Sequence, residues 1–428
     1  MQLQADQYYI QSMNYKNTLE FASSLDRNDP LNDYRRRFYI PKTESGQDYI
    51  YLCGNSLGLQ PKQTKKFVDQ EIKDWAELAV EGHFHAKNPW MPYHEFLTHS
   101  YAKIVGAETS EVVAMNTLTV NLHLMMVSFY NPEKQKNKIV IESDAFPSDI
   151  YAVESQIRFH GLDPKDTLIK ISPRVGEDCI RTSDFKDIIE NQKDEIALIM
   201  IGGVNYYTGQ VFDIEKISKI AQNFSIPIGV DLAHAAGNIK LELHKWGVDF
   251  AVWCSYKYLN SGPGSIGAAF IHKKHHNNNI KRFEGWWGHN KDNRFKMPDT
   301  FEAINSSEAW QLSNPPILSL AAVKSSLSIF DEVGMDALVK KSNTLTSYLA
   351  FLLEQIDSNK INIITPKERG CQISIQVKDS NKELFTTITN KGIMADWREP
   401  DVIRIAPVPL YNSFTDVFNF YNILKDSI

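Results

Sequence analysis

Short apolar runs separated by amphipathic segments restrict the fold of this chain more than any other feature. Each run has the length of a strand buried on both faces, and turn residues bound it. Asp213–Gln222, which lies between two of the runs, has the spacing of an amphipathic helix. Strands that alternate with helices predict a mostly parallel sheet covered on both faces. The runs are Lys138–Glu142, Ala197–Ile201, Pro227–Asp231, Phe250–Trp253 and Ala268–Ile271.

The 428 residues are too many for one domain of ordinary size, and they divide into three parts. Residues 1–60 are polar with charged clusters and predict an N-terminal arm that packs with the C-terminal domain. Residues 61–315 contain the alternating strands and helices and predict a large α/β domain. Residues 316–428 predict a smaller α+β domain, because helical patterning precedes the alternating segment Cys371–Val377.

Composition narrows the classes of partner and compartment. A net charge of −6 and a pI near 6.1 give no reason to expect nucleic acid or an anionic membrane as a partner. No apolar run approaches the roughly 20 residues that span a bilayer, and the first residues lack the pattern of a secretory leader. We therefore expect a cytoplasmic protein without a structural metal or disulfide framework, since its cysteines are far apart: Cys53, Cys179, Cys254 and Cys371.

Lys257 follows the apolar run Phe250–Trp253. It therefore lies beyond the carboxyl end of a predicted parallel strand, where ligands bind in α/β sheets. A poorly solvated lysine tends toward the neutral, nucleophilic amine that forms Schiff bases. A surface lysine that ends a strand is the commoner alternative for an isolated residue. The following loop Gly262–Gly267 matches GxGxxG, but a strand-like run follows it instead of a helix, which argues against dinucleotide binding.

Asp231 ends another apolar run and therefore belongs at the same edge of the sheet. A carboxylate buried there needs a cationic partner, and the pyridinium nitrogen of pyridoxal phosphate (PLP) is such a partner. The alternative is an N-cap for a helix that begins at Leu232. An aspartate upstream of a strand-end lysine is more specific than either residue alone.

Thr119 and Phe146 fit the same cofactor. Thr119 precedes an apolar helix, where free backbone N–H groups favour a phosphate, although a plain helix cap has the same pattern. Phe146 follows a strand and could stack on an aromatic ring, although such residues more often belong to the core. The run His272–Asn279 contains three histidines and predicts a solvated loop, not a metal site.

Six segments occur in an order that is shared with a known family: Tyr206–Gln210, Asp231–Ala235, Trp253–Asn260, Arg294–Met297, Ser313–Leu318 and Ile403–Phe414. Together they resemble kynureninase, a family of PLP enzymes with the aspartate aminotransferase fold (fold type I). The resemblance extends from about Tyr51 to Phe414. It implies hydrolysis of L-kynurenine or 3-hydroxy-L-kynurenine to L-alanine and anthranilate or 3-hydroxyanthranilate, in tryptophan catabolism and de novo NAD biosynthesis.

By position, the resemblance implies that Lys257 carries PLP, that Asp231 faces the ring nitrogen and that Tyr256 transfers a proton. Gly202 stands where several relatives have a serine that touches the cofactor, so at this position only the backbone N–H is left for a contact. Cofactor contacts from Trp286 and Asn314 would come from the neighbouring subunit of a homodimer with shared sites. The implied cofactor-binding residues are Leu118, Thr119, Phe146, Pro147, Ser148, Asp149, Gly202, Asp231, His234, Tyr256, Lys257, Trp286 and Asn314.

The resemblance also implies a substrate-binding set. Arg404 would bind the α-carboxylate through its bidentate guanidinium, and Ser56 belongs to the same substrate-binding set. His83 and Asn314 would lie near the aryl ring and recognise its hydroxyl, although His83 also fits an ordinary surface histidine.

Two other functions fit parts of the pattern. A cysteine desulfurase of the same fold needs a mobile reactive cysteine, whereas Cys254 lies inside a strand-like run. A PLP-fold scaffold without activity is the non-enzyme alternative, and the presence of Lys257, Asp231 and Arg404 argues against it.

Overall fold

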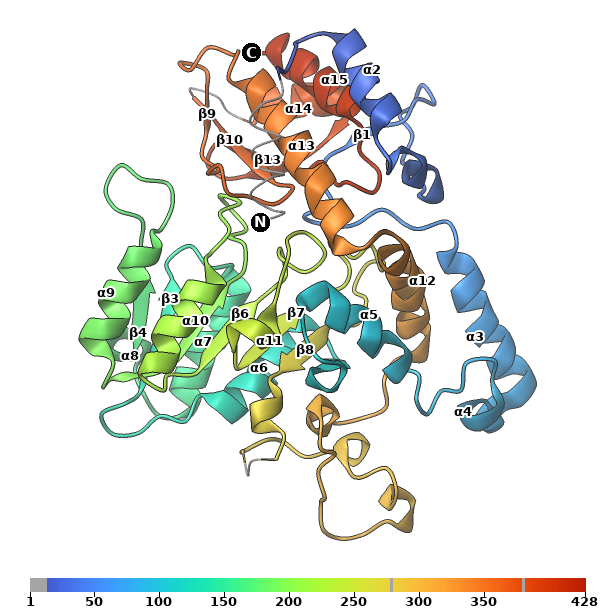
Figure 1. Cartoon of the computed structure of the whole chain (residues 1–428), viewed down its shortest axis with the longest axis vertical. Coiled ribbons are helices and arrows are strands. Elements are labelled where there is room, and N and C mark those ends of the chain that lie inside the picture. Colours follow the sequence, from blue (N-terminus) through green and yellow to red (C-terminus); the bar gives the residue numbers. More distant parts are fainter. Residues whose placement is uncertain (1–13, 278–279, 379–381) are drawn as a thin grey trace.

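A seven-stranded sheet forms the centre of the larger part of the molecule (Figure 1). The computed structural model describes residues 14–277, 280–378 and 382–428, so the first thirteen residues of the predicted arm and Asn278–Asn279 of the histidine-bearing loop lie outside it. The strands in spatial order are β2 (Val112–Ala114), β8 (Ala268–Ile271), β7 (Phe250–Trp253), β6 (Ile228–Asp231), β5 (Ile196–Gly202), β3 (Lys138–Glu142) and β4 (Leu168–Ile171).

The sheet is mostly parallel, as its apolar runs predict. Strands β7, β6, β5, β3 and β4 pair in parallel, whereas β8 and β2 are antiparallel to their neighbours. All five predicted strands are present. Because β3, β5, β6 and β7 are parallel, the residues that follow them meet at one edge of the sheet.

Alternate residues of each strand separate two hydrophobic cores, one on each face of the sheet. In β3, Ile139 and Ile141 pack into one core and Val140 into the other. The first core also receives α6 and α7, and the second receives α5, α9, α10 and α12. The helices of this part are α3 (Thr64–Leu78), α4 (Gly82–His85), α5 (Glu95–Val105), α6 (Leu118–Phe129), α7 (Pro147–Phe159), α8 (Pro164–Thr167), α9 (Thr182–Gln192), α10 (Ile214–Asn223), α11 (Leu243–Trp246) and α12 (Ile317–Val333).

The C-terminal part is an antiparallel sheet with helices packed on it. The N-terminal helix α2 (Leu19–Asn28) lies beside α15, and Asp26 accepts hydrogen bonds from the N–H groups of Phe414 (2.6 Å) and Thr415 (3.0 Å) (Figure 1). The two-residue strands β1 (Ile50–Tyr51) and β11 (Ile393–Met394) pair in parallel. The other elements are β12 (Asp396–Arg398), β13 (Val402–Ile405), β10 (Ile373–Val377), β9 (Ile361–Ile363), α13 (Met335–Leu353), α14 (Glu383–Asn390) and α15 (Phe414–Lys425).

We propose residues 1–60, 61–315 and 316–428 as the domain division, with the N-terminal arm belonging to the C-terminal domain. The contact of α2 with α15 supports this proposal for the arm. Helix α12 begins the third segment and packs against α3 and α5. Among the described residues, no helix combines the length and apolar character needed to cross a membrane.

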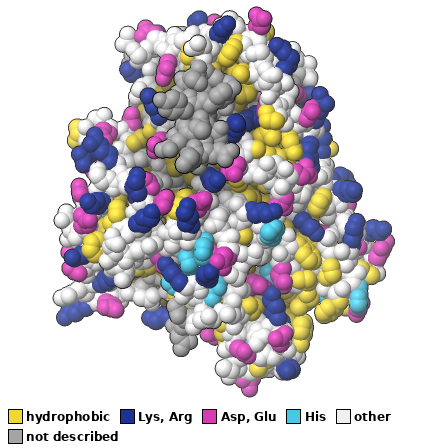
Figure 2. All heavy atoms as spheres, in the orientation of Figure 1, with side chains coloured by type: hydrophobic (Ala, Val, Ile, Leu, Met, Phe, Trp, Pro, Cys, Tyr) yellow, Lys and Arg dark blue, Asp and Glu magenta, His cyan; other side chains and the backbone are white. Residues whose placement is uncertain are grey.

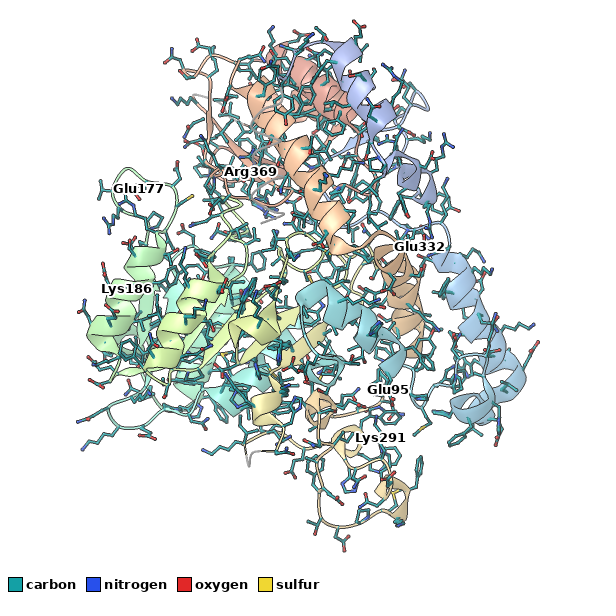
Figure 3. The ribbon with its side chains drawn as sticks, in the orientation of Figure 1. Glu95, Glu177, Lys186, Lys291, Glu332 and Arg369 are labelled. Carbon is teal, nitrogen blue, oxygen red and sulfur yellow. The ribbon has the colours of Figure 1, made fainter. Side chains whose placement is uncertain are left out.

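The segment between β8 and α12 is built from short 3-10 turns and is tied to the rest of the molecule by charges. The Nζ atom of Lys291 lies 2.8 Å from Glu95 of α5 and 2.7 Å from Glu308 (Figure 3). These ion pairs hold the loop against α5. Its turns are η4 (Lys273–His275), η5 (Trp286–Gly288), η6 (Arg294–Lys296) and η7 (Ser307–Trp310), and earlier turns are η1 (Asn32–Arg37), η2 (Ala79–Glu81) and η3 (Thr109–Glu111).

The prediction that His272–Asn279 is a solvated loop is wrong for its histidines. His276 is buried and its Nε2 lies 3.0 Å from the carbonyl oxygen of Ile271. His275 contacts the buried carboxylate of Asp249 at 2.8 Å. The polar composition suggested solvation, but a buried carboxylate at the start of β7 needs a partner, and the imidazole supplies one.

Asp29 and Lys341 form a buried ion pair of 2.6 Å between the N-terminal arm and α13. Asp29→Asn leaves the ammonium group without its counter-charge, so we expect a loss of about 3 kcal/mol in the free energy of unfolding. Urea unfolding followed by circular dichroism measures it. Asp33→Asn, which breaks an exposed pair with Arg36, is the control and should change stability by less than about 1 kcal/mol. Equal effects of the two substitutions would contradict the role of the buried pair.

Candidate active site

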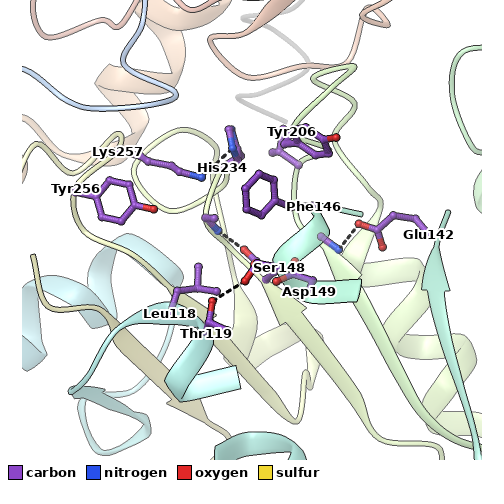
Figure 4. Close-up of a pocket in the computed structure, with 14 residues that line it drawn as sticks. Leu118, Thr119, Glu142, Phe146, Ser148, Asp149, Tyr206, His234, Tyr256 and Lys257 are labelled. Atoms are coloured by element: carbon purple, nitrogen blue, oxygen red, sulfur yellow. Dashed lines mark hydrogen bonds between the residues drawn. The ribbon is translucent and has the colours of Figure 1, made fainter. Parts of the chain in front are cut away.

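A pocket opens at the carboxyl ends of β3, β5 and β6, where the parallel strands predict a ligand site (Figure 4). Four of its residues have no role in the sequence-based prediction: Glu142, Val204, Tyr206 and Ala233. Ten predicted residues line it: Leu118, Thr119, Phe146, Ser148, Asp149, Gly202, Asp231, His234, Tyr256 and Lys257.

Lys257 lies in the turn that follows β7 and extends into the pocket. Its Nζ atom lies 3.0 Å from Nε2 of His234 and 5.8 Å from the centre of the Phe146 ring (Figure 4). The turn packs tightly against the chain at Gly58, where a Cβ atom would lie 2.3 Å from the carbonyl oxygen of Lys257. Gly58 also donates its N–H to the carbonyl oxygen of Tyr256 (2.8 Å). A glycine is therefore required at position 58 to hold the lysine in place.

His234 is the hydrogen-bond partner of this lysine and is buried. Its burial, together with the charges of Lys257, Arg404 and Arg398, lowers the pKa of His234 well below its ordinary range. The imidazole is therefore neutral at physiological pH and accepts a hydrogen bond from Nζ of Lys257. This contact aims the amine across the pocket.

Asp231 and Asp149 form a carboxyl pair opposite the lysine. Asp231 ends β6 and accepts a hydrogen bond from the N–H of Ala233 (2.5 Å), whereas Asp149 lies in the first turn of α7. Burial and the neighbouring Asp231 raise the pKa of Asp149 well above its ordinary value, and burial also raises the pKa of Asp231. The helix that would make Asp231 an N-cap is absent, because a turn follows β6.

Glu142 adds a third carboxyl group to the same pocket. It ends β3, is 3% exposed and accepts a hydrogen bond from the N–H of Gly202 (3.0 Å). Its other oxygen, Oε2, is buried and has no hydrogen-bond partner among the described residues. Burial raises the pKa of Glu142 to about 7. A charged residue at the end of a buried strand was the sequence signal that could have identified it.

Two helix N-termini meet on the other side of the pocket. Thr119 lies in the first turn of α6, and its Oγ1 is 2.9 Å from Oγ of Ser148 in the first turn of α7 (Figure 4). First-turn N–H groups have no intrahelical acceptor and, together with the helix dipoles, favour an anion. Thr119 is not the cap, because the helix starts one residue earlier with Thr117 as N-cap. Hydroxyls and free N–H groups here suit a phosphate.

Arg404 lies on β13 and does not line this pocket. Its Nη1 donates to the carbonyl oxygen of Tyr206 (2.6 Å), and its Nη2 donates to Asp396 of the neighbouring strand β12. Ser56 donates to the same carboxylate oxygen (2.5 Å). Two of the predicted substrate residues, Arg404 and Ser56, are therefore brought together through Asp396, which the sequence-based prediction did not include.

The remaining predicted residues are also outside the set that lines the pocket. Pro147 occupies the first position of α7. His83 contacts the carbonyl oxygen of Val80 at 2.9 Å and packs edge-on against Trp90. Trp286 donates to the carbonyl oxygen of Arg294 (3.1 Å) and is partly exposed, and Asn314 is exposed just before α12.

Known proteins resemble this chain over nearly its whole length. Residues 338–424 match the family model of the kynureninase C-terminal domain. A kynureninase from Christiangramia forsetii is 53% identical over 97% of this chain and 99% of its own length. Kynureninases from Flavobacterium psychrophilum (52%; 97% of this chain and 99% of the relative) and Myxococcus xanthus (51%; 96% and 97%) are similar over comparable lengths.

This chain belongs to the kynureninase family. Solved structures with the same fold include an apo cysteine desulfurase from Thermococcus onnurineus NA1, with a TM-score of 0.75 and 18% identity over 92% of this chain and 97% of the other. A C-DES mutant with glycine covalently linked to the PLP cofactor has a TM-score of 0.77 and 13% identity over 91% and 98%. The prediction of an α/β protein of PLP fold type I is therefore confirmed.

The cysteine desulfurase alternative has little support in this member of the kynureninase family. Cys254 is buried, and burial raises the pKa of its thiol. A buried thiol with a raised pKa forms little thiolate, which is the reactive species. The likeness to desulfurase structures concerns the fold alone.

Glu142 makes stability dependent on pH. Its pKa is 4.5 in an ordinary environment and about 7 in the fold, so the unfolded chain releases this proton first as the pH rises. The favourable contribution of protonated Glu142 to the free energy of unfolding is fully present below about pH 4.5 and is lost as the pH approaches 7. Without cofactor, Glu142→Gln should therefore gain about 2–3 kcal/mol relative to wild type between pH 5 and pH 7.5 in urea unfolding. A difference that stays constant across this range would contradict the titration.

Proposed function

We propose that this chain hydrolyses L-kynurenine, 3-hydroxy-L-kynurenine or both, and releases L-alanine with anthranilate or 3-hydroxyanthranilate. Similarity to kynureninases over nearly the whole chain supports the activity most directly. In chemical class the enzyme is a hydrolase of carbon–carbon bonds in ketones. We place it in tryptophan catabolism and de novo NAD biosynthesis, in the cytoplasm, where its four free cysteines would stay reduced.

The cofactor is pyridoxal phosphate, and the pocket residues fit it. The crowded carboxyl groups of Asp231 and Asp149 need a cation, which a protonated pyridine ring supplies. The first turns of α6 and α7 suit the phosphate, with Thr119 and Ser148 as hydroxyl donors. Phe146 lies where it can stack on the ring, and Lys257 is the amine for the covalent link.

When bound, the cofactor supplies an electron sink for a carbanion at the α-carbon of the substrate. Nζ of Lys257 would be the base that takes the α-proton of the substrate, and its hydrogen bond with Nε2 of His234 would keep it in position. Burial raises the pKa of Tyr256, so its hydroxyl stays protonated and can donate to the β-carbon after water has added to the γ-carbonyl and the carbon–carbon bond has broken. Asp231 stabilises the positive ring nitrogen.

Arg404 binds the α-carboxylate of the substrate, with Ser56 beside it. The Nε atom of Arg404 is buried and has no hydrogen-bond partner among the described residues, which supports an anion at this position. His83 and Asn314 recognise the 3-hydroxyl group of the aryl ring. The exposed amide of Asn314 is open to a second chain.

We also propose a homodimer in which Trp286 and Asn314 reach the cofactor of the partner subunit. Their positions outside the pocket of their own chain fit this arrangement. An exposed apolar surface formed by Ile72, Trp75 and Val80 of α3 and η2 supports it, because single-chain proteins rarely expose such groups together. In Figure 2 hydrophobic side chains show between charged ones over this region, at the right of the view.

Turnover tests the function directly. Purified protein with PLP should be yellow and should release a fluorescent anthranilate-type product from kynurenine, whereas Lys257→Ala should keep its circular dichroism spectrum and lose at least about a thousandfold in kcat. The loss follows from removal of both the covalent link and the base. Yellow protein without that product would indicate a different PLP reaction, and near-normal activity of Lys257→Ala would refute the assignment.

Substrate preference tests the role of His83. If His83 and Asn314 hydrogen-bond the ring hydroxyl, kcat/KM should favour 3-hydroxykynurenine by about tenfold or more, and His83→Phe should reduce that ratio toward unity. Both constants are measured from initial rates with each substrate. His85→Phe, at an exposed histidine two residues away, is the matched control. A clear preference of the wild type for kynurenine would remove the 3-hydroxy proposal.

A further inference from the structure

The positive charge of Arg404 is already balanced by a carboxylate inside the protein. Its side chain is 1% exposed, and its guanidinium forms an ion pair with Asp396, its direct partner across β12 and β13. The same oxygen of Asp396 also accepts a hydrogen bond from Oγ of Ser56. The two charges cancel, so a substrate carboxylate that approaches Arg404 also meets the negative charge of Asp396. Arg404 alone therefore provides little net attraction for an anion.

Arg398 supplies the missing positive charge. It lies two residues after Asp396 on β12, and side chains two apart on a strand point to the same face. Its Nη2 donates to the same oxygen of Asp396 (3.1 Å), and its side chain is 36% exposed. Arg398, Asp396 and Arg404 thus form one cluster on one face of the small sheet, with a net charge of +1.

Each of the two arginines also has one unsatisfied hydrogen-bond donor. The Nε atoms of Arg398 and of Arg404 are buried, and neither has a hydrogen-bond partner among the described residues. Buried donors are almost always satisfied, because an unpaired donor has lost its hydrogen bonds to water and gained none in return. Two unpaired donors beside a net positive charge are what a carboxylate with two oxygens requires.

A chain of contacts links the cluster to the catalytic pocket, although neither arginine lines it. Arg404 reaches across to the carbonyl oxygen of Tyr206, whose ring packs edge-on against Phe146 of the pocket at 5.3 Å. The charges of both arginines also lower the pKa of His234, which contacts Lys257. An amino acid whose α-amine is at Lys257 can therefore present its carboxylate to this cluster.

We propose that Arg398 is a second substrate-binding arginine, which binds the α-carboxylate together with Arg404 while Asp396 holds both guanidinium groups in position. The proposal rests on the proposed function, because it specifies the recognition of the same amino acid substrate. It makes the site selective for one negative charge at the α-carbon.

The test compares Arg398→Gln with Arg36→Gln, an arginine whose side chain is 85% exposed. The PLP-loaded variants are assayed with kynurenine, and the absorbance of the bound cofactor is used to titrate L-alanine and L-alaninamide, which differ in the α-carboxylate. We expect Arg398→Gln to raise the KM for kynurenine and the Kd for L-alanine about ten- to a hundredfold, with kcat changed far less. The Kd for L-alaninamide should stay the same, and Arg36→Gln should match wild type throughout.

Each other outcome has a distinct meaning. If Arg398→Gln weakens both probes equally, or weakens neither, Arg398 does not recognise the carboxylate and the proposal is overturned. If wild type fails to cleave kynurenine but the split between the two probes persists, the proposed function fails and the carboxylate site stands. Arg398→Lys retains the charge and should recover part of the affinity for L-alanine that Arg398→Gln loses. If Arg398 acts only through folding, Arg398→Lys should recover none of that affinity.

Discussion

The site depends on three buried carboxyl groups that are crowded at one edge of the sheet, opposite Lys257. Glu142, Asp149 and Asp231 are all buried there, and burial raises the pKa of each carboxyl group. The register of the sheet enforces this crowding, because Gly202 pairs with Asp231 across β5 and β6 while its N–H binds Glu142. Such a cluster is unfavourable by itself and becomes favourable when a positive ring lies against it.

A second cluster, with a net positive charge, lies on the small sheet and outside the set of residues that line the pocket. Arg398 and Arg404 surround Asp396 on the small sheet, and Arg404 reaches the large domain through the carbonyl oxygen of Tyr206. A kynurenine has a basic amine, a carboxylate and a ketone. In the proposed function the carboxyl cluster would hold the cofactor ring, the amine would bind at Lys257, and the arginine cluster would fix the carboxylate. The proposed reaction requires this alignment, since the bond to be broken lies beyond the α-carbon that they hold.

Local sequence patterns predicted the centre of the fold and the middle of the site. Phe250–Trp253 and Ala268–Ile271 are strands as expected, because unbroken apolar runs of this length between turn residues have few alternatives. Strand β4 was missed because it lies at the sheet edge and carries the charged Lys170 within its four residues. Lys257 and Asp231 could be identified because their strand-end positions are local properties.

Interactions between distant segments could not be predicted from local sequence patterns. Asp396 meets Arg404 only through the antiparallel register of β12 and β13, which no local spacing fixes. His275, which follows β8, contacts the carboxylate of Asp249 just before β7, and this too is a tertiary contact. Residues assigned to a partner subunit, Trp286 and Asn314, lie outside the pocket of their own chain, so their role depends on assembly.

The central claim is that Lys257 carries the cofactor, and chemical trapping tests it most directly. PLP-loaded protein is reduced with borohydride, digested and analysed by mass spectrometry. We expect a pyridoxyl-phosphate group on the peptide that contains Lys257, in nearly stoichiometric amount, and none after the same treatment of Lys257→Ala. Modification of a different lysine, or no stable modification of the wild type, would contradict it.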